Sequence, residues 1–300
     1  MSDYLVTAFY KFVPLPYYEK LRNDLLVFCN SKDLKGSILL AEEGINSTLA
    51  GSEENILDFL VFLRRIPEFK EIIHKESWAK KQPFDKMKVR LKKEIVNLGQ
   101  EGVNPLSHRG NNAKGNEWND LLEDPTVKII DTRNDYEIRI GTFKNTINPN
   151  TYGFKEFANW VEQNLDPKID KKVGMFCTGG IRCEKASSYM LSKGFKKVIQ
   201  LEGGILKYLE DTPIENSLWE GDCFVFDHRI AVNHDLVPQN YVICPGCGHV
   251  LDEKSREAQG YEESVSCCGC HDIIPESRLN RLRERKSNLD NVKKNTEKVI

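Results

Sequence analysis

The chain has 300 residues, with 43 basic and 45 acidic side chains and a formal net charge of −2. This length predicts two or three domains with ample core, and the balanced charge excludes bulk attraction to nucleic acid, so any such binding must come from local basic patches. No run approaches 18 apolar residues and no basic region precedes an apolar run at the N-terminus, so neither a membrane span nor a secretory signal is expected.

Residues 1–98 predict an independent α/β domain, the N-domain. Apolar spacing places strands at 4–13, 36–40, 47–50, 69–78 and 87–91, a helix at 17–30, and a second helix that runs to Pro67 after an N-cap at Ser52. This β-α-β-β-α-β order predicts a ferredoxin-like sandwich of the acylphosphatase type. Because the turn after the first strand has no glycine-rich phosphate loop, a binding or scaffold role is expected in place of acylphosphatase activity.

Four cations alternate with other residues near the end of the N-domain and form what we call the basic strip: Lys86, Lys88, Arg90 and Lys92. On a strand, this alternation places all four on one face. Such a strip is suited to contact the phosphate backbone of a nucleic acid, and it is the predicted nucleic-acid-binding surface of the N-domain. The alternative is a solvated strand face with no specific role.

Residues 99–116 are rich in Gly, Asn, Ser and Pro and predict a linker. Residues 117–215 predict a second domain with strands at 127–131, 173–176 and 198–201 and helices at 154–165 and 183–193. Strands that alternate with helices indicate a parallel sheet, in which ligands bind at the carboxyl ends of the strands.

Cys177 follows one of these strands directly and begins a segment that we call the thiol loop: Cys177, Thr178, Gly179, Gly180, Ile181 and Arg182. The glycines and the following helix predict backbone N–H groups around the sulfur, and Arg182 is expected to add a positive charge at the rim. Both effects lower the pKa of a thiol below its free value of about 8.5. The pattern therefore predicts a nucleophilic thiolate at Cys177.

Three further residues are expected to support the thiol loop: Asp131, Arg133 and Cys183. Asp131 is expected to order the loop through backbone hydrogen bonds, and Arg133 to pair with Glu137. Cys183 is either a resolving thiol or a small helix residue that faces the sheet, because a separation of six residues does not fix the distance between two sulfurs.

Residues 216–300 predict a cysteine-rich extension with a charged tail. Cys244, Cys247, Cys267 and Cys270 have the C-x2-C-x19-C-x2-C spacing of a four-thiolate zinc site. A structural zinc is expected, and a redox or iron–sulfur role is the alternative. Cys268 is a spare thiol, and His249 or His271 could replace a cysteine as ligand. The nine cysteines, odd in number, fit a reducing cytoplasm better than a disulfide scaffold.

Several segments of the second domain resemble the rhodanese (sulfurtransferase) family. They are the Asp-Thr-Arg sequence at 131–133, the thiol loop, and Leu-Glu-Gly-Gly-Ile at 201–205. Together with Glu-Glu-Gly-Ile-Asn at 42–46, Gly-Asp-Cys-Phe-Val-Phe-Asp at 221–227 and the two cysteine pairs, they resemble the bacterial tRNA uridine-34 hydroxylases over essentially the whole chain.

This resemblance implies oxygen-dependent hydroxylation of C5 of the wobble uridine, giving 5-hydroxyuridine, with Cys177 as the essential residue. It also implies molecular oxygen as co-substrate and the anticodon loop of tRNA as partner; no protein partner is indicated. Cys177 could act through a base adduct or a sulfenate. The rival interpretations are a sulfurtransferase with a persulfide on Cys177, and a zinc-stabilised tRNA-binding adaptor without catalysis.

Overall fold

The computed structural model describes residues 3–297, so the outermost ends of the predicted segments 1–98 and 216–300 lie outside the described residues. The chain divides into two units, one ending at Pro238 and one beginning at Gln239. Within the described residues, no helix is long and apolar enough to cross a membrane.

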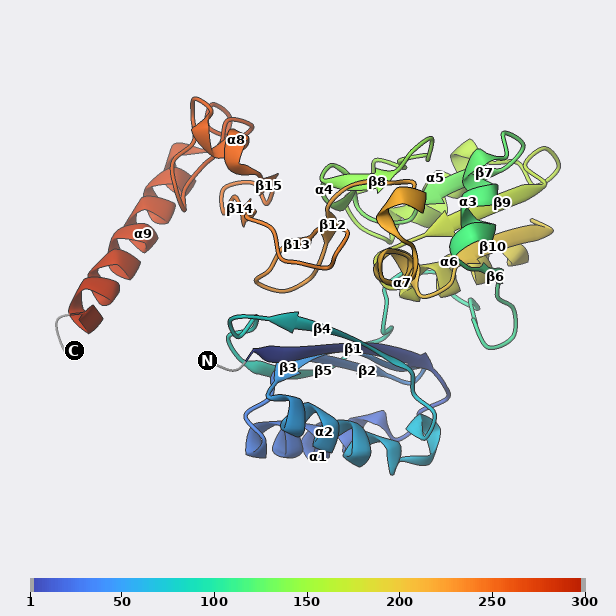
Figure 1. Ribbon diagram of the computed structural model, residues 1–300, viewed down its shortest axis with the longest axis horizontal. Helices are drawn as coiled ribbons and strands as arrows, with labels where there is room; N and C mark the ends of the chain where they lie inside the picture. Colours follow the sequence, from blue (N-terminus) through green and yellow to red (C-terminus); the bar gives the residue numbers. More distant parts are fainter. Residues whose placement is uncertain (1–2, 298–300) are drawn as a thin grey trace. The chain divides into compact units, whose positions relative to one another are not determined.

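The N-domain is a sheet with two helices on one face (Figure 1). Its strands are β1 (Tyr4–Phe12), β2 (Lys35–Ala41), β3 (Gly44–Gly51), β4 (His74–Ala79) and β5 (Met87–Leu91), and its helices are α1 (Tyr18–Ser31), α2 (Glu53–Arg64) and the short 3-10 helix η1 (Pro67–Phe69). The sheet order is β4-β1-β3-β2-β5, with β5 parallel to β2 and the other pairs antiparallel. The predicted ferredoxin-like sandwich is confirmed, with β5 as an added edge strand.

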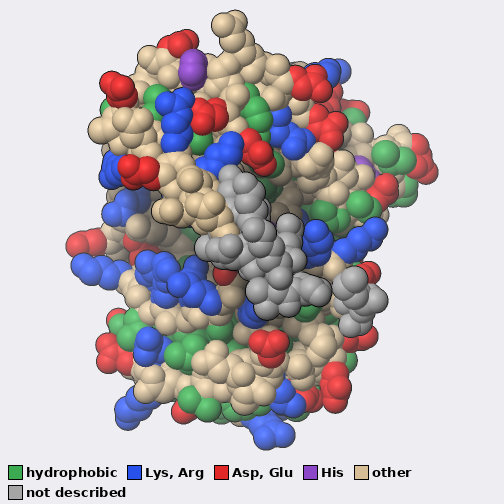
Figure 2. Space-filling model, turned by 90° about the vertical axis from the view of Figure 1, so that its left-hand side faces the viewer, with side chains coloured by type: hydrophobic (Ala, Val, Ile, Leu, Met, Phe, Trp, Pro, Cys, Tyr) green, Lys and Arg blue, Asp and Glu red, His purple; other side chains and the backbone are tan. Residues whose placement is uncertain are grey.

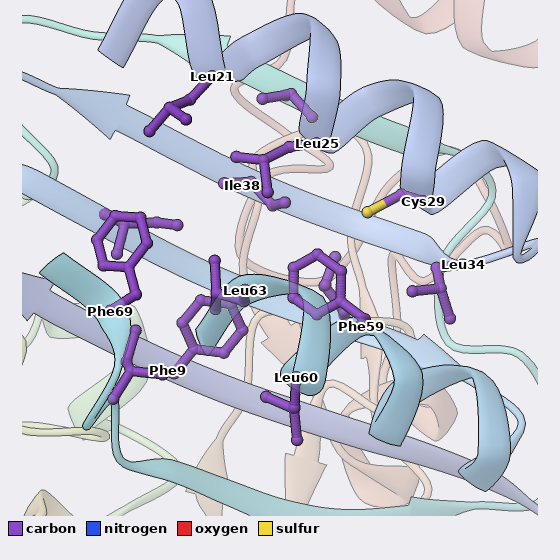
Figure 3. Packing of buried hydrophobic residues seen from close by; sticks show 14 of the residues in the cluster. Phe9, Leu21, Leu25, Cys29, Leu34, Ile38, Phe59, Leu60, Leu63 and Phe69 are labelled. Carbon is purple, nitrogen blue, oxygen red and sulfur yellow. The ribbon is translucent and has the colours of Figure 1, made fainter. Parts of the chain in front are cut away.

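The core of the N-domain lies between the helices and the sheet. Leu21, Leu25 and Cys29 of α1 meet Phe59, Leu60 and Leu63 of α2 over Phe9 and Ile38 of the sheet, as Figure 3 shows. Ser52 caps α2 as predicted, since its side chain accepts a hydrogen bond from the Asn55 N–H. The strand predicted at 69–78 begins only at His74, because Phe69 ends η1 and is buried in this core.

The second domain is the predicted α/β domain with a parallel sheet. Its strands are β6 (Asn111–Ala113), β7 (Lys128–Asp131), β9 (Lys172–Phe176) and β10 (Lys197–Leu201), in the order β6-β10-β9-β7. All three pairings are parallel. Its helices are α3 (Gly115–Glu123), α4 (Asp135–Ile138), α5 (Glu156–Asn164), α6 (Ile181–Ser192) and α7 (Gly204–Asp211).

Two predicted boundaries were wrong. The linker at 99–116 ends earlier, because Asn111–Ala113 pairs with β10 as an edge strand and α3 begins at Gly115. Part of the predicted extension 216–300 belongs to the second domain, because β11 (Trp219–Gly221) pairs with β8 (Gly141–Phe143). Three-residue strands carry too few side chains to show a period in the sequence.

The rest of the first unit is a small hairpin of β12 (Cys223–Phe224) and β13 (Ala231–Val232), preceded by the 3-10 helix η2 (Ile214–Asn216). The second unit contains the hairpin β14 (Val242–Ile243) and β15 (Val250–Leu251), and the helices α8 (Glu253–Glu257) and α9 (Glu276–Glu297). Its buried cluster consists of Leu251 and three of the predicted ligand cysteines. This unit therefore has little apolar core of its own.

Candidate active site

The thiol loop connects the end of β9 to the start of α6, as the sequence predicts. Cys177 follows Phe176 directly, and Gly180 is the N-cap of α6 with a φ of 98°. A side chain at Gly180 would be strained in this conformation, and its Cβ would lie 3.0 Å from the hydroxyl of Tyr10. A glycine at this position therefore lets the backbone turn tightly around the sulfur.

The Cys177 thiol is 1% exposed and accepts a hydrogen bond from the Gly180 N–H at 3.1 Å. Burial alone raises the pKa of Cys177, but a hydrogen bond with the Cys183 thiol, the charge of Arg182 and the N–H groups of residues 182 and 183 lower it to about 6. Burial and the neighbouring Cys177 raise the pKa of Cys183 well above its ordinary value. At neutral pH the pair is therefore a thiolate at Cys177 beside a protonated Cys183.

Arg182 lies close enough for its charge to act on Cys177, as predicted, but its side chain is buried. Its guanidinium donates to both carboxylate oxygens of Glu137, at 2.7 and 2.9 Å. A third bond, at 3.4 Å, goes to the Thr132 carbonyl. The pair fixes the positive charge near Cys177 but leaves Arg182 committed to the protein.

The prediction that Arg133 pairs with Glu137 was wrong. Arg133 binds the Asp131 carboxylate through Nε at 2.9 Å and Nη2 at 2.6 Å, and contacts only the backbone carbonyl of Glu137. Asp131 accepts one backbone bond, from the Arg133 N–H, and a bond from the Thr142 hydroxyl. Two buried cations need two buried carboxylates, and sequence spacing could not show which carboxylate each one takes.

Two N-domain residues that the sequence analysis missed reach the thiol loop. The Lys75 ammonium on β4 donates to the carbonyl oxygens of Gly179, at 2.7 Å, and Gly203. Burial lowers the pKa of Lys75 to about 8, against the opposing effect of the nearby Cys177. The Tyr10 hydroxyl on β1 lies 3.5 Å from Glu184 of α6. Strand alternation could place Tyr10 opposite the core residue Phe9, but could not reveal the loop that it faces.

A buried lysine joins the N-domain to the helix that follows the thiol loop. Lys185 of α6 is 3% exposed, and its ammonium binds Glu43 at 2.8 Å and Glu94 at 2.5 Å. Glu43 belongs to the Glu-Glu-Gly-Ile-Asn segment noted in the sequence. The two acidic residues come from turns of the N-domain, so both domains contribute to one charged cluster behind the site.

A cleft with a volume of about 1760 Å³ is lined by both domains of the first unit. Its walls include Cys177, Arg182, Lys75 and Tyr10. The opening thus exposes the region of the thiol loop to a large ligand, although the sulfur itself is nearly buried.

The basic strip lies on the sheet face that also lines this cleft. Lys88 and Arg90 of β5 pair in register with Ser37 and Leu39 of β2, two residues that line the cleft. Lys92 lines the cleft itself, and Lys86 is exposed just before β5. On the molecular face drawn in Figure 2, basic and acidic side chains are interspersed, as the balanced composition predicts.

The four predicted ligand cysteines come together in the second unit. The sulfur atoms of Cys244, Cys247, Cys267 and Cys270 all lie within 4.8 Å of one another. The pairs Cys244–Cys270 and Cys247–Cys267 are 3.7 and 3.5 Å apart, close to the edge of about 3.8 Å of a tetrahedral zinc–thiolate site. The cluster could therefore hold a metal ion, and the exposed Cys268 is not part of it.

Two family models match the chain. Residues 4–95 match the UPF0176 acylphosphatase-like domain, and residues 115–211 match the rhodanese-like domain. These matches agree with the two folds described above and contain Lys75 and the thiol loop, respectively.

The chain is also similar over nearly its whole length to curated bacterial proteins. It is 50% identical to the tRNA uridine(34) hydroxylase of Teredinibacter turnerae, over 97% of this chain and 90% of the relative. It is 47% identical to the tRNA uridine(34) hydroxylase of a Picosynechococcus species, over 95% of this chain and 96% of the relative. By this similarity, the chain belongs to the tRNA uridine(34) hydroxylase family.

Proposed function

We propose that this protein is an oxidoreductase that hydroxylates C5 of uridine 34 in tRNA, with Cys177 as its catalytic residue. The observation that carries the proposal is a thiol that accepts a hydrogen bond from the Gly180 N–H and lines a cleft large enough for a nucleotide. The lowered pKa of this thiol supports the same role. A wobble base is single-stranded and can be splayed out of its loop into such a cleft. The whole-length similarity to tRNA uridine(34) hydroxylases supports the same reaction.

The chemistry begins with attack of the Cys177 thiolate on C6 of uracil, which forms a C–S bond and moves the double-bond electrons toward C5 and O4. C5 then takes one atom of molecular oxygen. The second oxygen atom leaves as water, with two electrons and two protons from the two thiol groups of a dithiol, which becomes a disulfide. Loss of the C5 proton expels Cys177 and restores the double bond. N–H groups of the thiol loop are suited to stabilise the developing negative charge.

The basic strip is our proposed contact for the stem of the anticodon arm. Its exposed cations lie at the sheet edge, on the face that continues into the cleft. A phosphate backbone bound there would leave the loop bases free to enter the cleft. Sequence specificity would then come from the cleft and not from the strip.

We infer that the four-cysteine cluster holds a structural zinc. All four candidate ligands are cysteine sulfur atoms within 4.8 Å of one another, and four-cysteine sets are typical of closed zinc sites that serve folding. The second unit has little apolar core, so the metal would replace it as the main source of stability. We also infer a cytoplasmic location, because reduced thiols are required at both sites.

Nucleoside mass analysis of unmodified tRNA, incubated aerobically with the protein and a dithiol, tests the proposed reaction. Wild type should add one oxygen atom to uridine 34, Cys177→Ala should add none, and Cys268→Ser should behave as wild type because it changes an exposed thiol elsewhere. Uridine 34 left unchanged by the wild-type protein would contradict the proposal. A covalent complex of Cys177 with 5-fluorouridine tRNA would support the C6 adduct.

A sulfurtransferase remains the second candidate, because the same lowered pKa of Cys177 suits a persulfide carrier. It predicts that thiosulfate converts Cys177 to a persulfide with release of sulfite, and that cyanide then removes the outer sulfur atom as thiocyanate. Thiocyanate turnover without oxygen transfer to tRNA would favour this candidate over the hydroxylase.

A further inference from the structure

The ring of Phe226 is exposed in the cleft that contains Cys177. Phe226 is 57% exposed, whereas its neighbours Phe224 and Val225 are buried. Single exposed apolar side chains are common on proteins, so exposure alone assigns no role. Phe226 is unlike an ordinary exposed side chain in its location, because it lines the same cleft as Thr178 and Arg182 of the thiol loop.

Contacts from the thiol-loop side hold this ring in position. The Phe226 centroid lies 5.7 Å from the guanidinium carbon of Arg182. The ring of Phe224 meets it edge-on, with the centroids 5.1 Å apart. The carbonyl of Phe224 in turn faces the Thr178 hydroxyl at 3.5 Å. The position of the ring is therefore coupled to that of the loop that carries Cys177.

The segment that follows Phe226 is anchored to the N-domain. Arg229 binds the Asp227 carboxylate at 2.8 and 2.6 Å and donates to the Ser77 hydroxyl of β4 at 2.8 Å. The backbone N–H of His228 donates to the Pro83 carbonyl at 3.0 Å. With both flanks fixed, an aromatic ring at this position loses little conformational freedom when it binds a ligand.

We propose that Phe226 is the surface on which the target uracil stacks while Cys177 reacts with it; this inference rests on the proposed function. Splayed bases are commonly bound by stacking on aromatic side chains. Three other residues with aromatic rings line the cleft among the described residues. Phe9 is buried in the N-domain core, the Tyr10 hydroxyl is engaged with Glu184, and both ring nitrogens of His74 are bonded to Arg64 and Glu76. Phe226 is the one that presents a largely exposed ring.

Photocrosslinking tests the contact directly. A tRNA anticodon stem-loop with 5-iodouridine at position 34 is bound to Cys177→Ala, which cannot attack the base, and is irradiated. The crosslink should map by mass spectrometry to Phe226 and should be lost in Cys177→Ala/Phe226→Leu. A crosslink that maps to Tyr10 or His74 in place of Phe226 would overturn the inference.

Steady-state kinetics separate stacking from simple bulk. Phe226→Leu keeps an apolar side chain without a flat ring and should raise KM for tRNA about 10- to 100-fold, whereas Phe226→Tyr should stay within about threefold of wild type. Tyr152→Ala is the matched control, because Tyr152 is 86% exposed and does not line the cleft. Thiol alkylation rates at pH 7 should be equal in all variants if the thiol loop is intact.

The outcomes distinguish the inference from the function on which it rests. Oxygen transfer by wild type with an unchanged KM in Phe226→Leu would overturn the stacking role alone. Wild-type protein that adds no oxygen to tRNA would overturn the proposed function, and the stacking role with it.

Discussion

Lys75 of the N-domain donates a hydrogen bond to the carbonyl oxygen of Gly179 in the thiol loop, 2.7 Å away and 104 positions further along the chain. The same ammonium also binds the carbonyl of Gly203, at the start of α7. One cation from one domain thus ties together two loops of the other. The site around Cys177 is therefore completed by the N-domain.

Alkylation of Cys177 should follow the pKa of its thiol. We expect the rate with iodoacetamide to be half-maximal near pH 6 and to level off above about pH 7, because the pKa of Cys177 is lowered to about 6. The pKa of Cys177 is lower in the folded protein than in the unfolded chain, where it is about 8.5, so ionisation of this thiol stabilises the fold. This stabilisation is complete above the pKa in the unfolded chain and is lost as the pH falls through the pKa in the folded protein. Half-maximal alkylation near pH 8.5 would contradict this electrostatic account.

Lys75→Met should raise the pKa of Cys177 by about one unit, because it removes a cation that interacts with the thiolate. The pH profile of alkylation measures this shift in pKa. The variant should fall furthest below the wild-type rate between pH 6 and 7. Lys80→Met, at an exposed position just after β4, is the control and should leave the profile unchanged. Equal profiles for both variants would show that Lys75 has no electrostatic effect on Cys177.

Glu137→Gln should destabilise the protein strongly. It leaves the buried guanidinium of Arg182 without its counter-charge, a change that costs roughly 3 kcal/mol. Urea unfolding measures the loss. Glu162→Gln removes a carboxylate from an exposed pair with Lys193 and should leave the midpoint nearly unchanged. Similar urea midpoints for the two variants would contradict the claim that the buried pair stabilises the fold more than the exposed one.

Neutralising the basic strip should weaken tRNA binding without changing the chemistry of Cys177. For Lys88→Gln/Arg90→Gln we expect about tenfold weaker binding. The slope of the logarithm of the binding constant against the logarithm of salt concentration should become shallower by about two. Fluorescence anisotropy across salt concentrations measures both. Lys20→Gln/Arg65→Gln removes two exposed cations, one in α1 and one directly after α2, and serves as control. Unchanged affinity in the strip variant would support the solvated-face alternative.

Metal removal should affect only the second unit. Metal analysis of the purified protein should find one zinc per chain, which Cys244→Ser loses and Cys268→Ser retains. Chelation should make residues 239–297 sensitive to protease, because this unit has little apolar core. Alkylation of Cys177, which belongs to the first unit, should be unaffected. Protease resistance after complete zinc loss would argue against a structural role for the metal.

Local patterns in the sequence predicted the features that depend on neighbouring residues. An apolar run, a cysteine and two glycines predicted the strand, loop and helix around Cys177, and the cysteine spacing predicted the four-sulfur cluster. The Ser52 cap was confirmed for the same reason. In each case the interacting groups are close in sequence or share a recurrent spacing.

Features that depend on distant partners were missed or wrong. Lys75 and Tyr10 meet the second domain across 104 and 174 positions, and no local period signals such contacts. Arg133 was expected to pair with Glu137, but its guanidinium binds the Asp131 carboxylate instead. Arg182 lies beside Cys177 as expected, but its guanidinium is buried and bound by the Glu137 carboxylate.

The charged cluster around Lys185 limits how this protein can be dissected. Glu43 and Glu94 supply both carboxylates to an ammonium that is 3% exposed. A fragment that begins after residue 98 would present an uncompensated cation in the helix directly behind the reactive cysteine. Inactivity of such a fragment would therefore reveal nothing about substrate recognition, and a chimaera with another N-domain would need acidic residues at both positions before its specificity could be compared.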